Sequence, residues 1–238
     1  MKGFVKYVSA TILTAMISAP SIVQAEDLYY GLQMEEFEYR AGEHGEDLAV
    51  WNGDAFVGTD ELKLRWEGNG EFNLDGDVLE KFRNQLTLQT PISDFWDIKG
   101  GVRLDSPDGE DRWYGVAGIV GLAPQWIEVD ADLYLSEKGD ISASLDMEYE
   151  LLLTNYLILT PSAEIEGSFS SDRDIGVGSG INSAEIGLRL SYDVWDRTVS
   201  PYIGIAYERK FGQTADFAKE EGEETSVWSF VIGTKLLF

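Results

Sequence analysis

The sequence predicts a closed, antiparallel β-barrel that crosses a membrane. Three observations lead to this fold class: apolar and polar residues alternate along most of the 238-residue chain, residues 1–25 have the pattern of a secretory signal, and Phe238 ends a strand-like segment. Alternation over the length of a strand indicates a sheet with one face in an apolar medium and the other in a polar one. Strands cross lipid only as a closed barrel, because every backbone polar group there needs a partner.

The N-terminal segment predicts export. Lys2 and Lys6 form the positive region of a signal, residues 8–22 its apolar stretch and residues 23–25 its cleavage site. A retained anchor helix is the alternative, but the apolar stretch is short for a membrane span and contains Pro20. We therefore expect a secretory signal peptide at 1–25 and one barrel domain at 26–238, located in the bacterial outer membrane.

Charge and composition restrict the function. The net charge of −25 argues against a nucleic-acid partner, because phosphates would be repelled, and suits a cationic partner. The chain has no cysteine and a single histidine, His44. These counts exclude a thiolate metal site and a zinc site with two histidines, and a catalytic triad would depend on one loop residue. We expect a protein that is not an enzyme.

The clearest strands lie in the middle of the chain. In residues 127–136 every second residue is apolar and the residues between them are acidic or polar, and residues 140–151 repeat this pattern. Only residues 137–139 separate the two segments, so they form a hairpin.

The same parity predicts twelve strands, an even number, as in single-chain bacterial barrels. They span residues 29–40, 48–57, 60–70, 77–90, 95–105, 112–123, 126–136, 140–153, 156–168, 182–195, 200–211 and 226–238. Residues 51–54 could instead form a turn, and without the strands at 48–57 and 29–40 the count falls to ten.

The connections predict an orientation. Short turns at residues 91–94, 123–125, 154–155 and 196–198 alternate with longer or more charged connections at 70–76, 106–111, 169–181 and 212–225. Outer-membrane barrels keep short turns on the periplasmic side and longer loops outside, with aromatic residues at the interfaces. Phe95, Trp126 and Trp195 lie beside short turns, as such a girdle requires. A soluble protein of two packed sheets is the alternative, but its apolar face would carry larger and more irregular residues.

If the apolar faces contact lipid, the opposite faces line the lumen, and the predicted strands divide its charges into two walls. The predicted basic lumen wall comprises Lys63, Arg65, Lys81, Arg83, Lys99 and Arg103. The predicted cation-attracting wall comprises Glu128, Asp130, Asp132, Asp146, Glu148, Glu150, Glu164, Glu166 and Glu185. The surplus of acid would favour cations over anions. Two arrangements remain open at this point: salt bridges that fill the lumen, and a narrow aqueous path past them.

Several sequence blocks, in order along most of the barrel domain, resemble the copper resistance protein B family of outer-membrane proteins. They are YGLQ at 30–33, EYR at 38–40, FWD at 95–97, GVR at 101–103, GLAPQWIEVD at 121–130, YELLLT at 149–154, GVGSG at 176–180, EIGLRL at 185–190 and ERKFGQTADFA at 208–218. The resemblance implies a role in copper homeostasis, with copper ions as ligand or cargo. It also implies outer-membrane lipid and periplasmic copper-resistance proteins, such as a multicopper oxidase, as partners.

One feature departs from the family. Its members commonly carry a Met- and His-rich segment between the signal and the barrel, whereas here Glu26 and Asp27 lead directly into the first predicted strand. Thioether and imidazole ligands suit copper, so few candidate ligands remain. They are Met34, expected toward the outer part of the first strand, and His44 with Glu43 in the following loop.

The main functional prediction is therefore a copper resistance protein that binds or conducts copper ions through an acid-walled barrel. A structural barrel with a filled lumen and no transport is the first alternative. An outer-membrane hydrolase built on Ser179 or His44 is the second, but the chain lacks a Gly-x-Ser-x-Gly elbow on a strand-to-helix turn.

Overall fold

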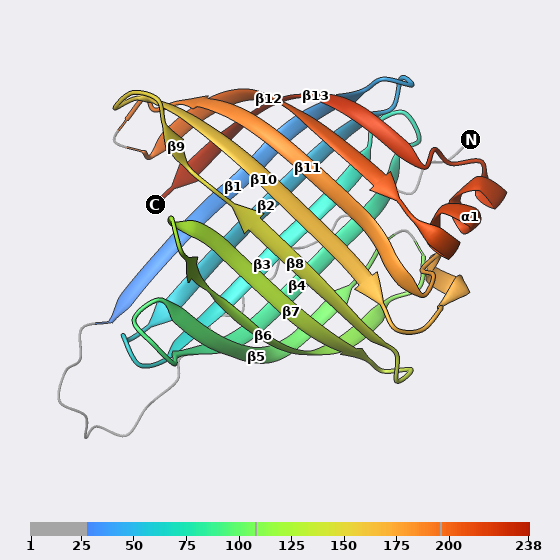
Figure 1. The fold of residues 1–238 in the computed structure, drawn as a ribbon, viewed down its shortest axis with the longest axis horizontal. Coiled ribbons are helices and arrows are strands. Elements are labelled where there is room, and N and C mark those ends of the chain that lie inside the picture. Colours follow the sequence, from blue (N-terminus) through green and yellow to red (C-terminus); the bar gives the residue numbers. More distant parts are fainter. Residues whose placement is uncertain (1–27, 108, 196) are drawn as a thin grey trace, which may run out of the picture.

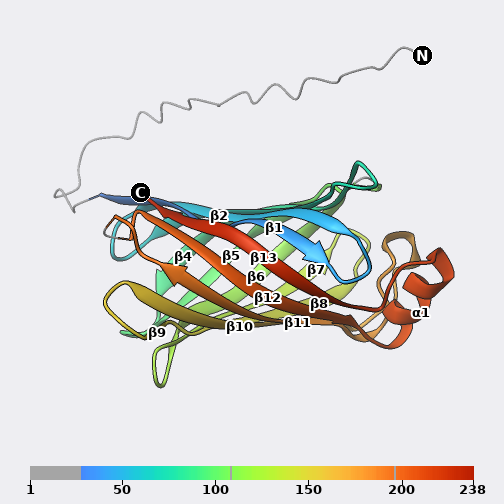
Figure 2. The same ribbon diagram turned by 90° about the horizontal axis from the view of Figure 1, so that it is seen from above.

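The computed structural model describes residues 28–107, 109–195 and 197–238, and they form a closed antiparallel β-barrel. The predicted secretory signal at residues 1–25 lies outside the described residues. Figure 1 shows the strands side by side and tilted against the long axis, and Figure 2 shows the same cylinder from above. None of the helices within the described ranges is long and apolar enough to cross a membrane.

Twelve strands form the barrel, and one of them is interrupted. The strands are β1 Tyr29–Gly42, β2 Asp47–Gly58, β3 Lys63–Asn73, β4 Val78–Pro91, β5 Trp96–Asp105, β6 Arg112–Ala123, β7 Ile127–Ser136, β8 Ile141–Glu148, β9 Leu151–Leu152, β10 Leu157–Ser168, β11 Gly180–Tyr192, β12 Val199–Lys210 and β13 Ser226–Leu237. Both β8 and β9 pair with β10, so they are two parts of one strand, broken at residues 149–150.

Strands that follow one another in the chain pair with each other, with β8 and β9 counted as one strand, and one further pairing closes the ring. The first strand, β1, pairs with the last, β13, so no edge is left open. Residues 51–54 lie within β2 and do not form a turn. The predicted barrel of twelve strands is therefore confirmed, and the fallback of ten is not needed.

The two faces of the barrel differ as the alternation predicts. On β7 the outward Leu133 is 54% exposed, whereas the adjacent inward Asp132 is only 5% exposed. Large apolar side chains are exposed on every wall, and buried polar side chains dominate the interior. A soluble protein with two packed sheets would bury the apolar face instead. The outer surface therefore suits lipid, and the polar interior forms the lumen.

Local side-chain hydrogen bonds explain where strand ends differ from prediction. The third strand begins at Lys63 rather than residue 60, because the Thr59 hydroxyl accepts hydrogen bonds from the amides of Glu61 and Leu62 and holds a turn. The same strand continues to Asn73, whose side chain accepts bonds from the next turn. Ser, Thr, Asn and Asp side chains commonly compete with the ladder in this way.

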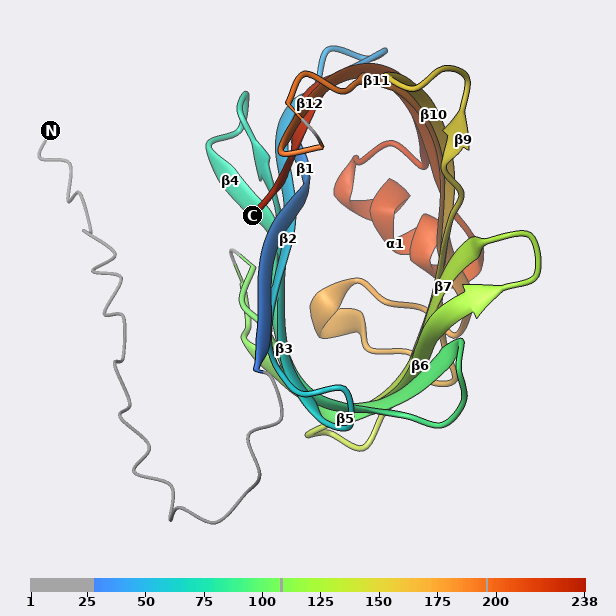
Figure 3. The same cartoon turned by 90° about the vertical axis from the view of Figure 1, so that its left-hand side faces the viewer.

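The connections also follow the prediction, with one addition. The short turns lie at one end of the barrel, where Phe95 packs edge-on against Trp126 with ring centroids 6.4 Å apart. The longer loops lie at the other end and contain a 3₁₀ helix, η1 (Arg173–Ile175), and an α-helix, α1 (Gly212–Glu221). The sequence predicted only a loop over the α1 segment. In the view along the barrel, both helices lie across the opening (Figure 3).

Candidate functional site

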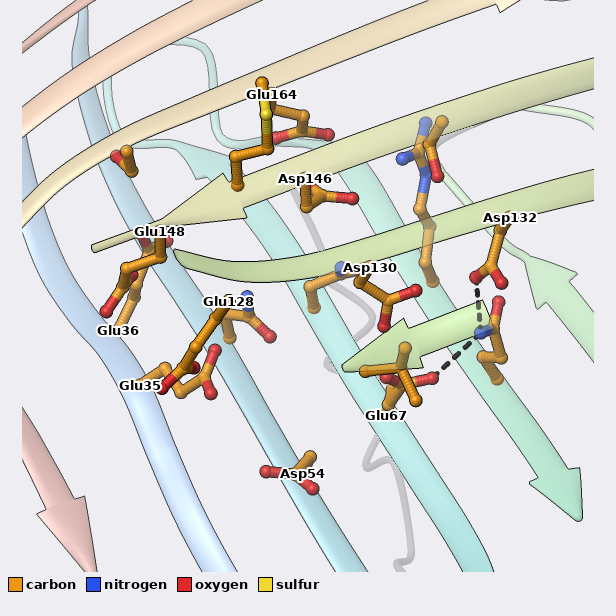
Figure 4. Close-up of a pocket in the computed structure, with 18 of the residues that line it drawn as sticks. Glu35, Glu36, Asp54, Glu67, Glu128, Asp130, Asp132, Asp146, Glu148 and Glu164 are labelled. Atoms are coloured by element: carbon orange, nitrogen blue, oxygen red, sulfur yellow. Dashed lines mark hydrogen bonds between the residues drawn. The ribbon is translucent and has the colours of Figure 1, made fainter. Parts of the chain in front are cut away.

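The lumen holds a central cavity of about 530 Å³. Twelve acidic and eight basic side chains line this cavity, which leaves a surplus of negative charge. Ten of the acids are labelled in Figure 4, and they come from both sides of the barrel. The basic members are Arg40, Arg65, Lys81, Arg83, Lys99, Arg103, Arg189 and Lys235.

One side of the lumen is an acidic wall built by β7, β8 and β10. Its members are Glu128, Asp130, Asp132, Asp146, Glu148, Glu164 and Glu166. No lysine or arginine lies on these three strands, all of which the structure describes. The predicted Glu185 lines the same cavity from β11. The predicted Glu150 lies at the short-turn end, where it pairs with Arg197 at 3.0 Å.

A row of carboxylates crosses this wall at one level. Asp130 lies opposite Asp146, Asp146 opposite Glu164, Glu164 opposite Glu185, and Glu185 opposite Glu208. Directly opposite side chains on an antiparallel pair have Cβ atoms about 4.5–5.5 Å apart, and like charges there repel each other. Such a row concentrates negative potential along one side of the lumen.

The opposite side is mixed rather than basic, which corrects the predicted pair of oppositely charged walls. All six predicted basic residues face inward, but each lies close to an acid. The pairs are Lys63 with Asp97 (3.6 Å), Arg65 with Asp54 (2.9 Å), Lys81 with Glu71 (3.2 Å), Lys99 with Asp130 (2.7 Å), Arg103 with Asp105 (2.5 Å) and Arg83 with Glu166. Glu67 and Glu71 share the parity of Arg65 on β3, so the alternation already indicated that acids lie on this wall.

A buried cluster that the sequence analysis missed joins β1 to β11. The Glu38 carboxylate accepts hydrogen bonds from Arg40 (2.7 Å), Arg189 (2.6 Å) and the Tyr202 hydroxyl (2.8 Å). Arg189 also pairs with Glu36 at 2.5 Å. The alternation could not place these acids, because the register of β1 shifts between Met34 and Glu36. The inward parity therefore changes within the strand, as it does at a β-bulge.

Several ion pairs cross the lumen. Lys235 on β13 reaches Glu148 on β8 at 2.7 Å, and Arg83 on β4 pairs with Glu166 on β10. The predicted pairing across the lumen is thus present, but some acidic side chains have no basic partner in it. Among the described residues, no basic group lies within ion-pair distance of Glu128, Asp146 or Glu164. The lumen therefore contains both ion pairs and a cavity lined in part by acids that have no close basic partner.

The long-loop end carries a second, smaller cavity of about 180 Å³ beneath a cap of interlocked loops. The amide of Gly178 donates to the Thr214 hydroxyl at 2.9 Å, which joins the η1 loop to α1. Lys138, in the loop after β7, donates to Asp174 at 2.8 Å. This contact lowers the pKa of Asp174 and raises the pKa of Lys138.

Similarity to known proteins identifies the family of this chain. The sequence profile described as "Copper resistance protein B precursor (CopB)" matches residues 28–238. The chain belongs to the copper resistance protein B family. It is 32% identical over 204 residues to the copper resistance protein B homolog of Pseudomonas syringae pv. tomato, covering 86% of this chain and 68% of that protein. It is also 32% identical over 214 residues to copper resistance protein B of Escherichia coli, covering 88% and 69%.

The fold agrees with an outer-membrane location for this member of the family. The NanC porin superposes with a TM-score of 0.51 at 13% identity, covering 87% of this chain and 99% of the porin. At this identity the likeness concerns the fold alone. The closed barrel, the apolar outer face and the family place the protein in the outer membrane.

The predicted copper ligands are not brought together in the structure. His44 Nε2 lies 3.7 Å from Glu43 Oε1, in the exposed turn after β1. Met34 lies in the half of β1 nearer the short turns, not toward the outer end as expected, and packs on Gly53. About ten residues of strand, roughly 30 Å, separate it from His44. Within the described ranges no three His, Asp or Glu side chains are arranged to hold a metal ion.

Proposed function

We propose that this member of the copper resistance protein B family binds copper ions transiently in its lumen and conducts them across the outer membrane. The acidic wall carries this proposal, because it places seven carboxylates on three strands that lack any basic side chain. The mixed wall opposite compensates only part of this charge. Cations are therefore expected to concentrate in the lumen, and anions to be repelled.

The chemistry of the donor set favours passage over storage. Carboxylate oxygens are hard ligands that bind divalent cations without selecting copper, whereas thioether sulfur and imidazole nitrogen are the donors that favour copper. Among the residues that the structure describes, carboxylates are the main anionic donors around the cavity, whose lining includes a single methionine, Met147, and no histidine. His44 with Glu43 lies in a loop at the mouth, where these side chains could hold a copper ion before it enters. Weak sites in series allow an ion to enter and also to leave.

We expect partner proteins on the periplasmic side. The family name supports a link to copper resistance, and on that basis we expect periplasmic copper-resistance proteins, such as a multicopper oxidase, as partners. The family and the porin-like fold also favour a non-enzymatic role. The hydrolase alternative gains no support from geometry, because the Ser179 hydroxyl lies 3.2 Å from Gln213 Oε1 in the η1 loop, while His44 belongs to the β1–β2 turn.

A structural barrel without transport remains the second candidate, because Lys235–Glu148 and Arg83–Glu166 tie opposite walls together. If these ties close the lumen, neutralising its free acids will not change copper handling.

The test compares copper tolerance and cell copper content in a strain without the protein and in strains that carry variants of it. The Asp146→Asn/Glu164→Gln variant removes two free acids from the row. The Glu221→Gln/Glu224→Gln variant removes the same number of charges from the exposed loop and serves as the matched control. We expect the lumen variant to lose part of the copper phenotype and the loop variant to keep it. Indifference of every strain to copper would overturn the proposal.

A further inference from the structure

The two cavities of the lumen meet at a boundary formed by a few side chains. The central cavity of about 530 Å³ and the outer cavity of about 180 Å³ share Lys81, Arg83, Arg103 and Tyr134 as lining residues. Three of these four residues are basic, although the lumen as a whole is acidic. An ion that moves from the mouth to the acidic row must pass this boundary.

One ion pair at the boundary spans the lumen. Arg83 on β4 is hydrogen-bonded to Glu166 on β10, and four strands separate β4 from β10 in the shorter direction around the ring. In the view along the barrel these strands lie on opposite sides of a flattened ring (Figure 3). Arg83 Nε also lies 3.6 Å from Asp105. The pair therefore acts as a bridge between the walls.

The neighbouring side chains hold this bridge in place. Arg103 donates two hydrogen bonds to Asp105, at 2.6 and 2.5 Å, and its guanidinium lies over the rings of Tyr134 and Tyr114, at 4.3 and 5.0 Å from their centroids. A guanidinium fixed by a bidentate carboxylate and two aromatic faces has little freedom to move. Arg83 and Glu166 can therefore move apart while Arg103 keeps its contacts with Asp105 and the two tyrosine rings.

We propose that the Arg83–Glu166 bridge is the specificity-determining constriction of the lumen, which sets the size and charge of the ions that pass between the outer and central cavities. This inference rests on the proposed function, because it takes the lumen to be the route. The intact bridge is neutral overall and narrows the path. Without Arg83 the exposed Glu166 attracts cations, and without Glu166 the exposed Arg83 repels them.

Planar-bilayer recordings with purified protein in a potassium chloride gradient test this inference. We expect Arg83→Gln to raise conductance and to shift the reversal potential toward cation selectivity. Glu166→Gln should shift it toward anions. The double variant Arg83→Gln/Glu166→Gln should conduct more than wild type, with a selectivity closer to wild type than either single variant. The controls are Lys219→Gln and Glu221→Gln, which change the same charges on the exposed face of α1 and should match wild type.

Opposite shifts of the two single variants separate this inference from a purely structural role, which would impair both variants alike. If a single variant fails to fold, the exchanged pair Arg83→Glu/Glu166→Arg restores a bridge and should return wild-type conductance. Equal shifts, or silence of both wild type and the double variant, would overturn the constriction. Copper tolerance is read separately, so a conducting barrel with no copper phenotype would overturn the proposed function and leave the constriction standing.

Discussion

The Tyr202 hydroxyl on β12 donates a 2.8 Å hydrogen bond to Glu38 on β1, although β13 lies between these strands. Gly233 on β13 pairs with both residues, and its missing side chain leaves room for the tyrosine ring. A Cβ at this position would lie 2.7 Å from the ring. The contact crosses the seam at which the first and last strands close the barrel.

Loss of the Tyr202 hydroxyl should weaken the closed barrel. Tyr202→Phe removes one donor from a carboxylate whose side chain has no exposed surface, at an expected cost of about 1–3 kcal/mol in the free energy of unfolding. Urea unfolding of the barrel in lipid vesicles measures this cost. Tyr30→Phe is the control, because Tyr30 is 82% exposed. Equal stability of the two variants would contradict the importance of the seam contact.

Removing Arg189 should cost more. The Arg189 side chain is 3% exposed and pairs with both Glu36 and Glu38, so Arg189→Gln removes the 2.5 Å partner of Glu36 and one of the three donors to Glu38. Breaking a buried ion pair in this way typically costs about 3–5 kcal/mol. The exposed Arg209→Gln variant should change the free energy of unfolding by less than about 0.5 kcal/mol. A comparable change for both arginines in the same unfolding experiment would show that the cluster does not stabilise the barrel.

Gly118 should be required for the ion pairs of Lys99. A Cβ at Gly118 would lie 1.9 Å from Asp132 Oδ1 and 2.6 Å from the backbone oxygen of Ala131. We expect Gly118→Ala to displace Asp132 from Lys99 and to destabilise the barrel by about 1–3 kcal/mol. Gly115→Ala on the same strand, whose Cβ would meet nothing closer than 4.0 Å, is the control. A crystal structure of Gly118→Ala with the 3.0 Å contact of Lys99 to Asp132 intact would contradict this expectation.

The loop contact between Lys138 and Asp174 should depend on pH. The ion pair lowers the folded-state pKa of Asp174, so its contribution is present above the unfolded-state pKa and is lost as the pH falls through the folded value. The raised pKa of Lys138 gives the opposite limit: its contribution is lost only as the pH rises through that value. Both groups are exposed, so salt should weaken the contact. Protease cleavage of the loop at 169–179, followed against pH, should increase in acid, and Asp174→Asn should flatten that profile.

Most of the fold could be predicted from the sequence, because the alternation of apolar and polar residues directly indicates which side chains face lipid. Less of the candidate site could be predicted from the sequence. The bulge between Met34 and Glu36 reverses the parity of β1, so Glu38 and Arg40 could not be placed. The partners Arg83 and Glu166 are 83 residues apart, and their contact depends on the flattened shape of the closed ring. The α1 segment has few apolar residues to mark a helical face, and only Ala215 and Ala218 are buried.

The reversal potential of wild-type protein in a planar bilayer under a salt gradient tests the central claim most directly. The acidic wall predicts selectivity for cations, and Asp146→Asn/Glu164→Gln should reduce that selectivity while the barrel stays folded. Selectivity for anions in the wild type, or a reversal potential that does not respond to these two substitutions, would contradict a lumen that guides cations.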